Sequence, residues 1–152
     1  MKIAVGSDHI AVDLKNMIVD YLKSKKIEVI DVGTYNKERT HYPIYASKAC
    51  DYVLNGEAKY AILICGTGVG MSMAANKIAG IRACCCSDTY SAKMTKVHNN
   101  ANVLCFGSLV VGFGLAKELI DAFLENEYEG GRHEVRMDML KEIEKGNYKK
   151  VS

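Results

Sequence analysis

The sequence predicts one α/β domain, residues 1–152, with a single doubly wound parallel sheet of about five strands and helices on both faces. Its length of 152 residues suits one domain with a sizeable core. Short apolar runs alternate along the chain with stretches of helical period. These runs lack a polar face, as expected when helices cover both sides of a parallel sheet.

Each element follows from its own residue pattern, in chain order. Strands are expected at Lys2–Gly6, Glu28–Val32, Tyr60–Cys65, Ile81–Cys86 and Asn102–Phe106. Helices are expected at Val12–Lys25, Ile44–Leu54, Met71–Asn76, Thr89–Val97, Leu115–Glu125 and Arg132–Glu144. The last helix follows two glycines and carries an apolar stripe with Leu140 and Ile143, so we expect it to make subunit contact.

Composition narrows the function classes. A net charge of +2 with no basic stripe argues against a nucleic-acid partner. The first residues turn polar after a few positions, which leaves no room for a signal peptide or a membrane span, and we expect a cytoplasmic protein. Most of the six cysteines are expected to be small buried hydrophobes, since no CxxC pair occurs and neighbouring strand residues face opposite ways. We therefore predict no metal and no cofactor.

The most informative segment is Ile62–Ser72, in which a buried strand ends at Cys65 and a glycine-rich loop follows. Such a loop presents peptide N–H groups to an anion, and the following helix start favours a thiolate. Met71 stands where a dinucleotide fingerprint needs its third glycine, and no P-loop pattern occurs. The loop thus suits a single phosphate or a small oxyanion, although a purely structural turn would also explain it.

Further polar clusters follow other strands. Ser7-Asp8-His9 follows the first, Ser87-Asp88 the fourth and Gly107-Ser108 the fifth. Ligands of open α/β sheets bind outside the carboxyl ends of the strands, so these clusters are candidate site residues. Asp8 and His9 could equally be a turn and a surface histidine.

Two more candidates lie on helices. His98 and Asn99 stand at a helix end, where a histidine can also act only as a cap. Arg132 and Arg136 lie one turn apart on one face and can fork onto a phosphate, or else form surface salt bridges.

Taken together, these segments resemble the B-type ribose-5-phosphate isomerases and the galactose-6-phosphate isomerase subunits. The resemblance covers about residues 1–145, and its motifs are Gly6-Ser7-Asp8-His9, Glu28–Thr34, Ile62–Gly70, Ala74–Lys77, His98-Asn99 and Glu129–His133. It implies a Rossmann-like homodimer or tetramer with active sites at the subunit interface. It also implies metal-free interconversion of aldose and ketose sugar phosphates.

The resemblance further implies roles for individual residues. Cys65 would carry the proton between C2 and C1, Thr67 and the loop N–H groups would stabilise the enediolate, and His98 would open the sugar ring. The residues expected to hold the sugar and its phosphate are Asp8, His9, Tyr42, Gly66, Gly68, Val69, Gly70, Asn99, Arg132 and Arg136.

Two departures from the family pattern concern the substrate. Many pentose enzymes of the family have Asp-Tyr-Pro where this chain has His41-Tyr42-Pro43, and an arginine where it has Leu109. Ribose 5-phosphate to ribulose 5-phosphate is the leading prediction. Isomerisation of a hexose 6-phosphate, galactose or allose 6-phosphate, is the alternative.

Three other classes of function are alternatives to this isomerase. A cysteine hydrolase would use Cys65 as nucleophile and His98 as base. A non-catalytic sugar-phosphate sensor would bind ligand without exchanging its proton. A metal-dependent hydride-shift isomerase would need clustered carboxylates and histidines, and no suitable spacing appears in the sequence.

Overall fold

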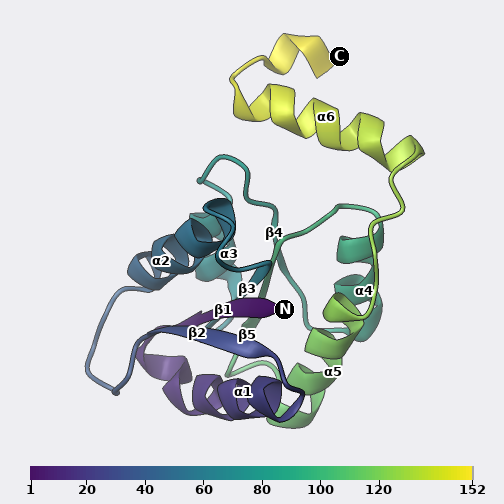
Figure 1. Cartoon of the computed structure of the whole chain (residues 1–152). Coiled ribbons are helices and arrows are strands. Elements are labelled where there is room, and N and C mark those ends of the chain that lie inside the picture. The colour runs from purple at the N-terminus through teal and green to yellow at the C-terminus, as the bar shows by residue number, and fades with distance from the viewer. Residues whose placement is uncertain (152) are drawn as a thin grey trace.

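The computed structural model describes residues 1–151 and contains a five-stranded sheet in which every paired strand is parallel (Figure 1). The strand order is β2-β1-β3-β5-β4. The strands are β1 (Lys2–Ser7), β2 (Glu28–Gly33), β3 (Tyr60–Cys65), β4 (Ala83–Cys85) and β5 (Val103–Gly107). The prediction of a doubly wound parallel sheet is confirmed.

Helices cover both faces of this sheet. Helices α1 and α5 pack on one face and α2 and α3 on the other, as the two core clusters show. The helices are α1 (Val12–Ser24), α2 (Tyr42–Leu54), α3 (Val69–Ala75), α4 (Thr89–Val97), α5 (Phe113–Leu124) and α6 (Arg132–Glu144), with 3-10 turns at His9–Ala11 and Tyr148–Val151.

Strand β3 shows how the two-sided core is built. Ile62 and Ile64 belong to the cluster on the α1 and α5 side, while Leu63 and Cys65 belong to the cluster on the α2 and α3 side. This alternation is the period of two of a β-strand, and here both faces are apolar because both are covered. Cys65 therefore ends the strand on the side from which α3 begins.

Strand β4 is shorter than predicted at its amino end. The Asn76 side chain accepts a hydrogen bond from the Ala83 N–H and donates one to the Ala83 carbonyl, both at 2.8 Å. The Arg82 N–H donates to the side chain of Asn102 at 2.8 Å. The Asn76 amide thus bonds the first residue of β4, and the Asn102 side chain takes the N–H of the residue before it.

One ion pair anchors α1 to the edge of the sheet. The Lys15 ammonium is fully buried and binds the carboxylate of Asp31 on β2, which is 28% exposed. The second carboxylate oxygen of Asp31 accepts a hydrogen bond from the Gly33 N–H at 2.9 Å. The pair lies next to the turn that leaves β2.

Helix α6 projects away from the layered body (Figure 1). It buries only His133 and Met137, and leaves Val135, Met139 and Leu140 exposed by 59, 43 and 47%. Near its end, Glu144 accepts a hydrogen bond from the Gly80 N–H at 3.0 Å. The helix therefore has little support from its own chain.

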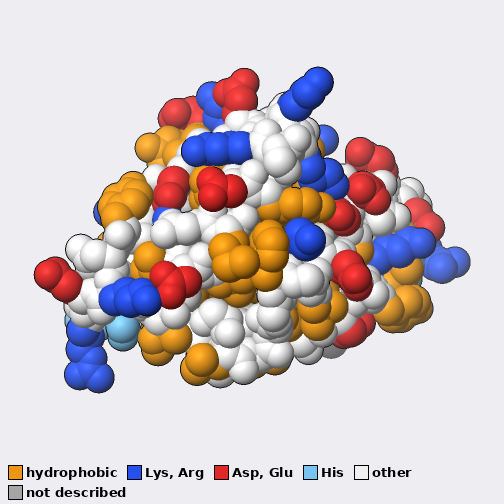
Figure 2. Space-filling model, turned by 90° about the horizontal axis from the view of Figure 1, so that it is seen from below, with side chains coloured by type: hydrophobic (Ala, Val, Ile, Leu, Met, Phe, Trp, Pro, Cys, Tyr) orange, Lys and Arg blue, Asp and Glu red, His pale blue; other side chains and the backbone are white. Residues whose placement is uncertain are grey.

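Charged side chains of both signs lie on the face of the molecule seen from below. Acidic and basic side chains are interspersed there among apolar ones (Figure 2). Within residues 1–151, none of the helices has the length and apolar character needed to cross a membrane.

Candidate active site

The loop after β3 folds back on the thiol at the end of that strand. The Gly68 N–H donates a hydrogen bond to the Cys65 sulfur at 3.1 Å. The Val69 N–H donates to the Thr67 hydroxyl at 3.3 Å, and Thr67 itself is exposed. The loop thus places a thiol, a hydroxyl and peptide N–H groups together at the carboxyl edge of the sheet.

Two glycines allow this loop to lie close to β5. Gly68 has φ +82°, and a Cβ there would stand 2.7 Å from the Phe106 backbone and 2.9 Å from the Cys85 sulfur. A Cβ on Gly107 would stand 2.5 Å from the Gly66 carbonyl oxygen. Because backbone cannot yield as a flexible side chain does, any larger residue at either position would displace the loop.

Tyr42, which the resemblance assigns to substrate binding, also lies against the loop. It opens α2, and a Cβ on Gly70 would meet its ring at 2.8 Å. Tyr42 is 39% exposed, so one part of the ring remains open to a ligand.

Asp8 and His9 lie at the same edge of the sheet. The Asp8 N–H donates to the Ile64 carbonyl at 3.2 Å, which ties the residue to β3 beside Cys65. The Asp8 carboxylate is buried and accepts from the Ile10 N–H at 3.0 Å. The His9 Nδ1 accepts from the Thr40 N–H at 3.3 Å, which leaves its Nε2 for another partner.

Two apolar residues border the loop, and the sequence did not assign them to it. The Leu109 side chain lies 3.5 Å, and that of Ile10 3.9 Å, from the position of a Cβ on Gly66. They are 76% and 50% exposed. Leu109 stands where the family pattern has an arginine, so an apolar wall occupies a position expected to carry charge. Each directly follows a polar cluster at a strand end, Asp8-His9 or Gly107-Ser108, and this was the available signal in the sequence.

The other cysteines differ from Cys65. Burial raises the pKa of the Cys50 and Cys86 thiols to about 12. Burial also raises the pKa of Cys105 well above its usual range. These three fit the prediction of small buried hydrophobes. Cys85 does not, because it is exposed and lies against the loop after β3.

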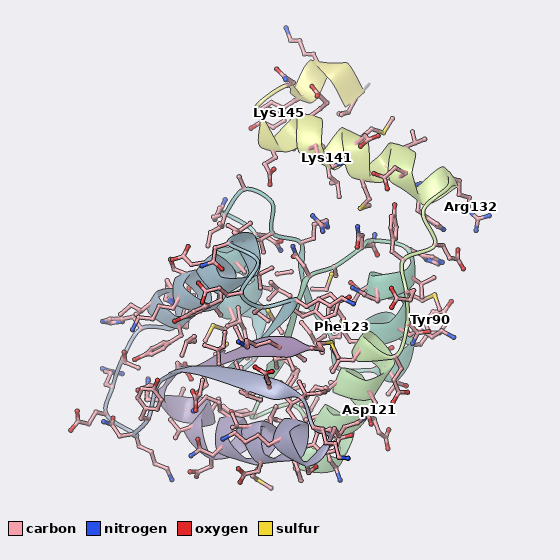
Figure 3. All side chains as sticks on the ribbon, in the orientation of Figure 1. Tyr90, Asp121, Phe123, Arg132, Lys141 and Lys145 are labelled. Carbon is pink, nitrogen blue, oxygen red and sulfur yellow. The ribbon has the colours of Figure 1, made fainter. Side chains whose placement is uncertain are left out.

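A second polar cluster forms where α4 ends and α6 begins. The rings of His98 and His133 are stacked, with centroids 4.3 Å apart and planes 16° from parallel. An Arg136 guanidinium nitrogen lies 3.3 Å from the His133 Nδ1. The Glu129 carboxylate lies 3.6 Å from the His133 Nε2. Arg132 starts α6 and points outward (Figure 3).

Within one chain the two clusters are far apart. Cys65 ends β3 at the carboxyl edge of the sheet, whereas His98 ends α4, just before the start of β5. Strand β5 has five residues, so its length of roughly 13 Å separates the two levels. The alternation of parallel strands with returning helices already requires this, since each helix ends at the amino edge.

The second cluster also contains groups that the sequence spacing did not suggest as metal ligands. Ligand atoms of His98, Glu129 and His133 lie within 4.8 Å of one another and could hold a metal ion. Glu129 and His133 are four residues apart, and this spacing is the feature of the sequence that could have indicated shared metal ligands. A guanidinium can only donate, so the contact from Arg136 requires a lone pair on the His133 Nδ1. This disfavours a neutral ring that also offers Nε2 to a metal.

Comparison with known proteins shows the family to which this chain belongs. The family model described as Ribose/Galactose Isomerase matches residues 3–140. The chain belongs to this family. The prediction made from its motifs is therefore confirmed, and the protein is an isomerase of the ribose/galactose isomerase family.

Individual members of the family resemble it over nearly their full length. Ribose-5-phosphate isomerase B of Escherichia coli is 54% identical over 143 residues, covering 94% of this chain and 96% of the relative. The LacB subunit of galactose-6-phosphate isomerase of Clostridium acetobutylicum is 44% identical over 152 residues, covering 97% and 88%. The structure of Clostridium thermocellum ribose-5-phosphate isomerase B matches with a TM-score of 0.95 at 47% identity, covering 96% and 99%.

Proposed function

We propose that this isomerase interconverts ribose 5-phosphate and ribulose 5-phosphate through a cis-enediolate, with Cys65 as the proton carrier and no metal ion in the step. The observation that carries the proposal is the Cys65 sulfur held by the Gly68 N–H, 3.1 Å away, beside further peptide N–H groups. Proton transfer next to a carbonyl needs a positioned base and donors for the oxyanion. The higher identity to the ribose-5-phosphate isomerase B, 54% against 44% for the LacB subunit, supports a pentose substrate.

The central step is one proton transfer on one face of the open-chain sugar. The Cys65 thiolate takes the proton from C2, the C–H electrons form the C1–C2 double bond, and the C1 carbonyl oxygen becomes the enediolate oxygen. Donation by the Thr67 hydroxyl and the loop N–H groups stabilises this charge. The thiol then returns the proton to C1, the carbonyl forms at C2, and the hydroxyl proton passes from O2 to O1.

The active site is proposed to combine residues of two copies of the chain. One copy supplies Cys65 and Thr67 with Asp8, and the second supplies the cluster around His98. The opposite positions of Cys65 and His98 in one chain support this, because no sugar phosphate could contact both as base and ring-opening acid in a single copy. The exposed apolar residues of α6 support contact with a second copy, in a homodimer or a tetramer.

Ring opening and phosphate binding fall to the second cluster. The His98 imidazole would donate a proton to the ring oxygen as the C1 hydroxyl loses one. Arg132 and Arg136 would hold the phosphate together with His9 of the other copy. Tyr42 and Asn99 would contact the sugar hydroxyls.

A substrate panel with a matched cysteine control tests the proposal. Turnover is measured on ribose 5-phosphate, allose 6-phosphate and galactose 6-phosphate, together with deuterium uptake from D2O at C1 of ribulose 5-phosphate. Wild type is expected to prefer ribose 5-phosphate. Cys65→Ala should lose turnover and exchange by at least about 100-fold, the scale of general base catalysis. Cys50→Ala removes a buried thiol elsewhere and should keep both. Full activity of Cys65→Ala would rule out the mechanism.

A hexose 6-phosphate is the second candidate, and Leu109 favours it. This exposed apolar residue borders the loop where the family pattern has an arginine, so one polar contact of a pentose enzyme is missing. A higher kcat/KM on allose or galactose 6-phosphate than on ribose 5-phosphate would decide for this alternative.

A further inference from the structure

The stacked histidines form a small network in which each polar contact has a defined direction. His98 comes from the end of α4 and His133 from the first turn of α6. His133 is 6% exposed, and its ring lies 4.3 Å from that of His98. A buried aromatic partner at this distance restrains the plane of the ring that it contacts.

The contact with Arg136 fixes the tautomer of His133. A guanidinium has donors only, so the His133 Nδ1 must accept the hydrogen bond at 3.3 Å and carries no proton. The proton of the neutral ring is then on Nε2, which faces the Glu129 carboxylate at 3.6 Å. The His133 Nε2 has no hydrogen-bond partner among the described residues, so this atom is not held by another donor or acceptor.

The charged groups around His133 favour its neutral form. Burial lowers the pKa of His133 first, followed by the neighbouring His98, Arg132 and Arg136, and only Glu129 raises it. Both arginines come from α6, His98 from α4, and Glu129 from the segment before α6. A neutral His133 ring can stack on His98 without charge repulsion between the two rings.

We propose that His133 is a positioning residue. It holds the His98 ring and the Arg136 guanidinium in the orientations in which both can contact the same sugar phosphate. Its ring face restrains His98, and its Nδ1 directs Arg136. The inference rests on the proposed function, in which His98 opens the sugar ring and Arg136 binds the phosphate. His133 itself need not touch the substrate.

Two substitutions separate the two parts of this role. His133→Phe keeps an aromatic face for His98 and removes the acceptor for Arg136. His133→Asn keeps an acceptor near the position of Nδ1 and removes the stacking face. Each variant is thus the matched control for the other, and thermal unfolding and mass measurements check that both fold and assemble as wild type does.

The expected kinetics differ between the two variants. His133→Phe should raise KM for ribose 5-phosphate about 5- to 10-fold with little change in kcat, as expected when a charge-assisted phosphate contact loosens. His133→Asn should lower kcat about 10-fold or more with KM nearly unchanged, since a misplaced acid costs turnover. Deuterium exchange at C1 of saturating ribulose 5-phosphate should persist in both, because ribulose 5-phosphate is open-chain and its exchange needs no ring opening.

Several outcomes would overturn the proposal while leaving the proposed function intact. One is unchanged kcat and KM in both variants beside an active wild type. Another is an equal loss of turnover and exchange in both, which would indicate a purely structural role. Activation of wild type by added Zn²⁺ that Glu129→Gln abolishes would assign the cluster to a metal instead. If wild type itself neither turns over nor exchanges any sugar phosphate, the proposed function fails first.

Discussion

Cys65 and His98 stand at opposite edges of the sheet of one chain. Cys65 is level with Gly107, the last residue of β5, while His98 precedes the first residue of that strand. This relationship follows from the parallel topology, in which each strand runs one way and each helix returns. An active site that uses both residues must therefore join the carboxyl edge of one copy to the α4–α6 corner of another.

Mixed assemblies of two inactive variants should regain activity. In a heterodimer of Cys65→Ala and His98→Asn chains, one site combines both substitutions and the other has none. We expect each homodimer to be inactive and the heterodimer, purified by two different tags, to show about half of the wild-type turnover. Turnover on ribose 5-phosphate gives the measurement.

The control for this experiment is a heterodimer of Cys65→Ala with wild type. It should also show about half of the wild-type turnover, since one of its two sites is intact. Absence of recovery in the doubly tagged heterodimer, with this control active, would place Cys65 and His98 in the same site of one copy.

Gly68 should not tolerate a side chain. Gly68→Ala places a Cβ 2.7 Å from the Phe106 backbone at a φ of +82°. We expect a loss of at least about 2 kcal/mol in the free energy of unfolding and a large loss of turnover, because the loop that holds Cys65 must move. Gly114→Ala is the control, since a Cβ there meets nothing within 4 Å and lies in a helix. Urea unfolding should show that it is neutral or stabilised by about 0.4–1 kcal/mol.

The buried Lys15 should depend on its counter-ion. Asp31→Asn leaves a fully buried ammonium without a charged partner, and we expect it to destabilise the fold by about 2–3 kcal/mol. This is below the full range for buried pairs, because Asp31 is 28% exposed. Lys15→Met should cost less, since it removes the charge and keeps the length of the side chain. Urea unfolding of both variants makes the comparison, and a costlier Lys15→Met would contradict it.

Stability should fall as pH falls below about 6.5, the ordinary value for histidine. The pKa of His133 is lowered in the folded chain, chiefly by burial and next by His98, so the unfolded chain binds the proton more readily. The contribution of His133 to the free energy of unfolding is then fully present above that pH and is lost on acidification. Thermal unfolding at pH 7.5 and 5.5 measures the change. His133→Asn should show a smaller decrease, and an equal one would refute the assignment.

The fold was predictable because its local signals agree with its topology. The apolar run Tyr60–Cys65 and the helices Thr89–Val97 and Arg132–Glu144 have the bounds that the sequence predicts. Strand β4 was predicted too long, because the apolar run Ile81–Cys86 does not show that pairing with β5 is limited to Ala83–Cys85.

The candidate site was predictable in its parts and less so in its arrangement. The Cys65 loop and the Arg132 and Arg136 pair carry local patterns, so they could be proposed as site residues from the chain alone. The stacking of His133 on His98 joins two helix ends, and nothing in either segment encodes that contact. The position of Leu109 against the loop likewise depends on the packing of β5 beside β3.

In the proposed assembly of two or more copies, helix α6 would couple subunit contact to its own folding. It has 13 residues and buries only His133 and Met137 against its own chain. A helix of that length is marginal in water unless another surface packs against it. In a separated copy it is therefore expected to fray, and the arginines it carries would lose their common orientation. Dilution would then remove phosphate recognition and quaternary structure in a single cooperative event.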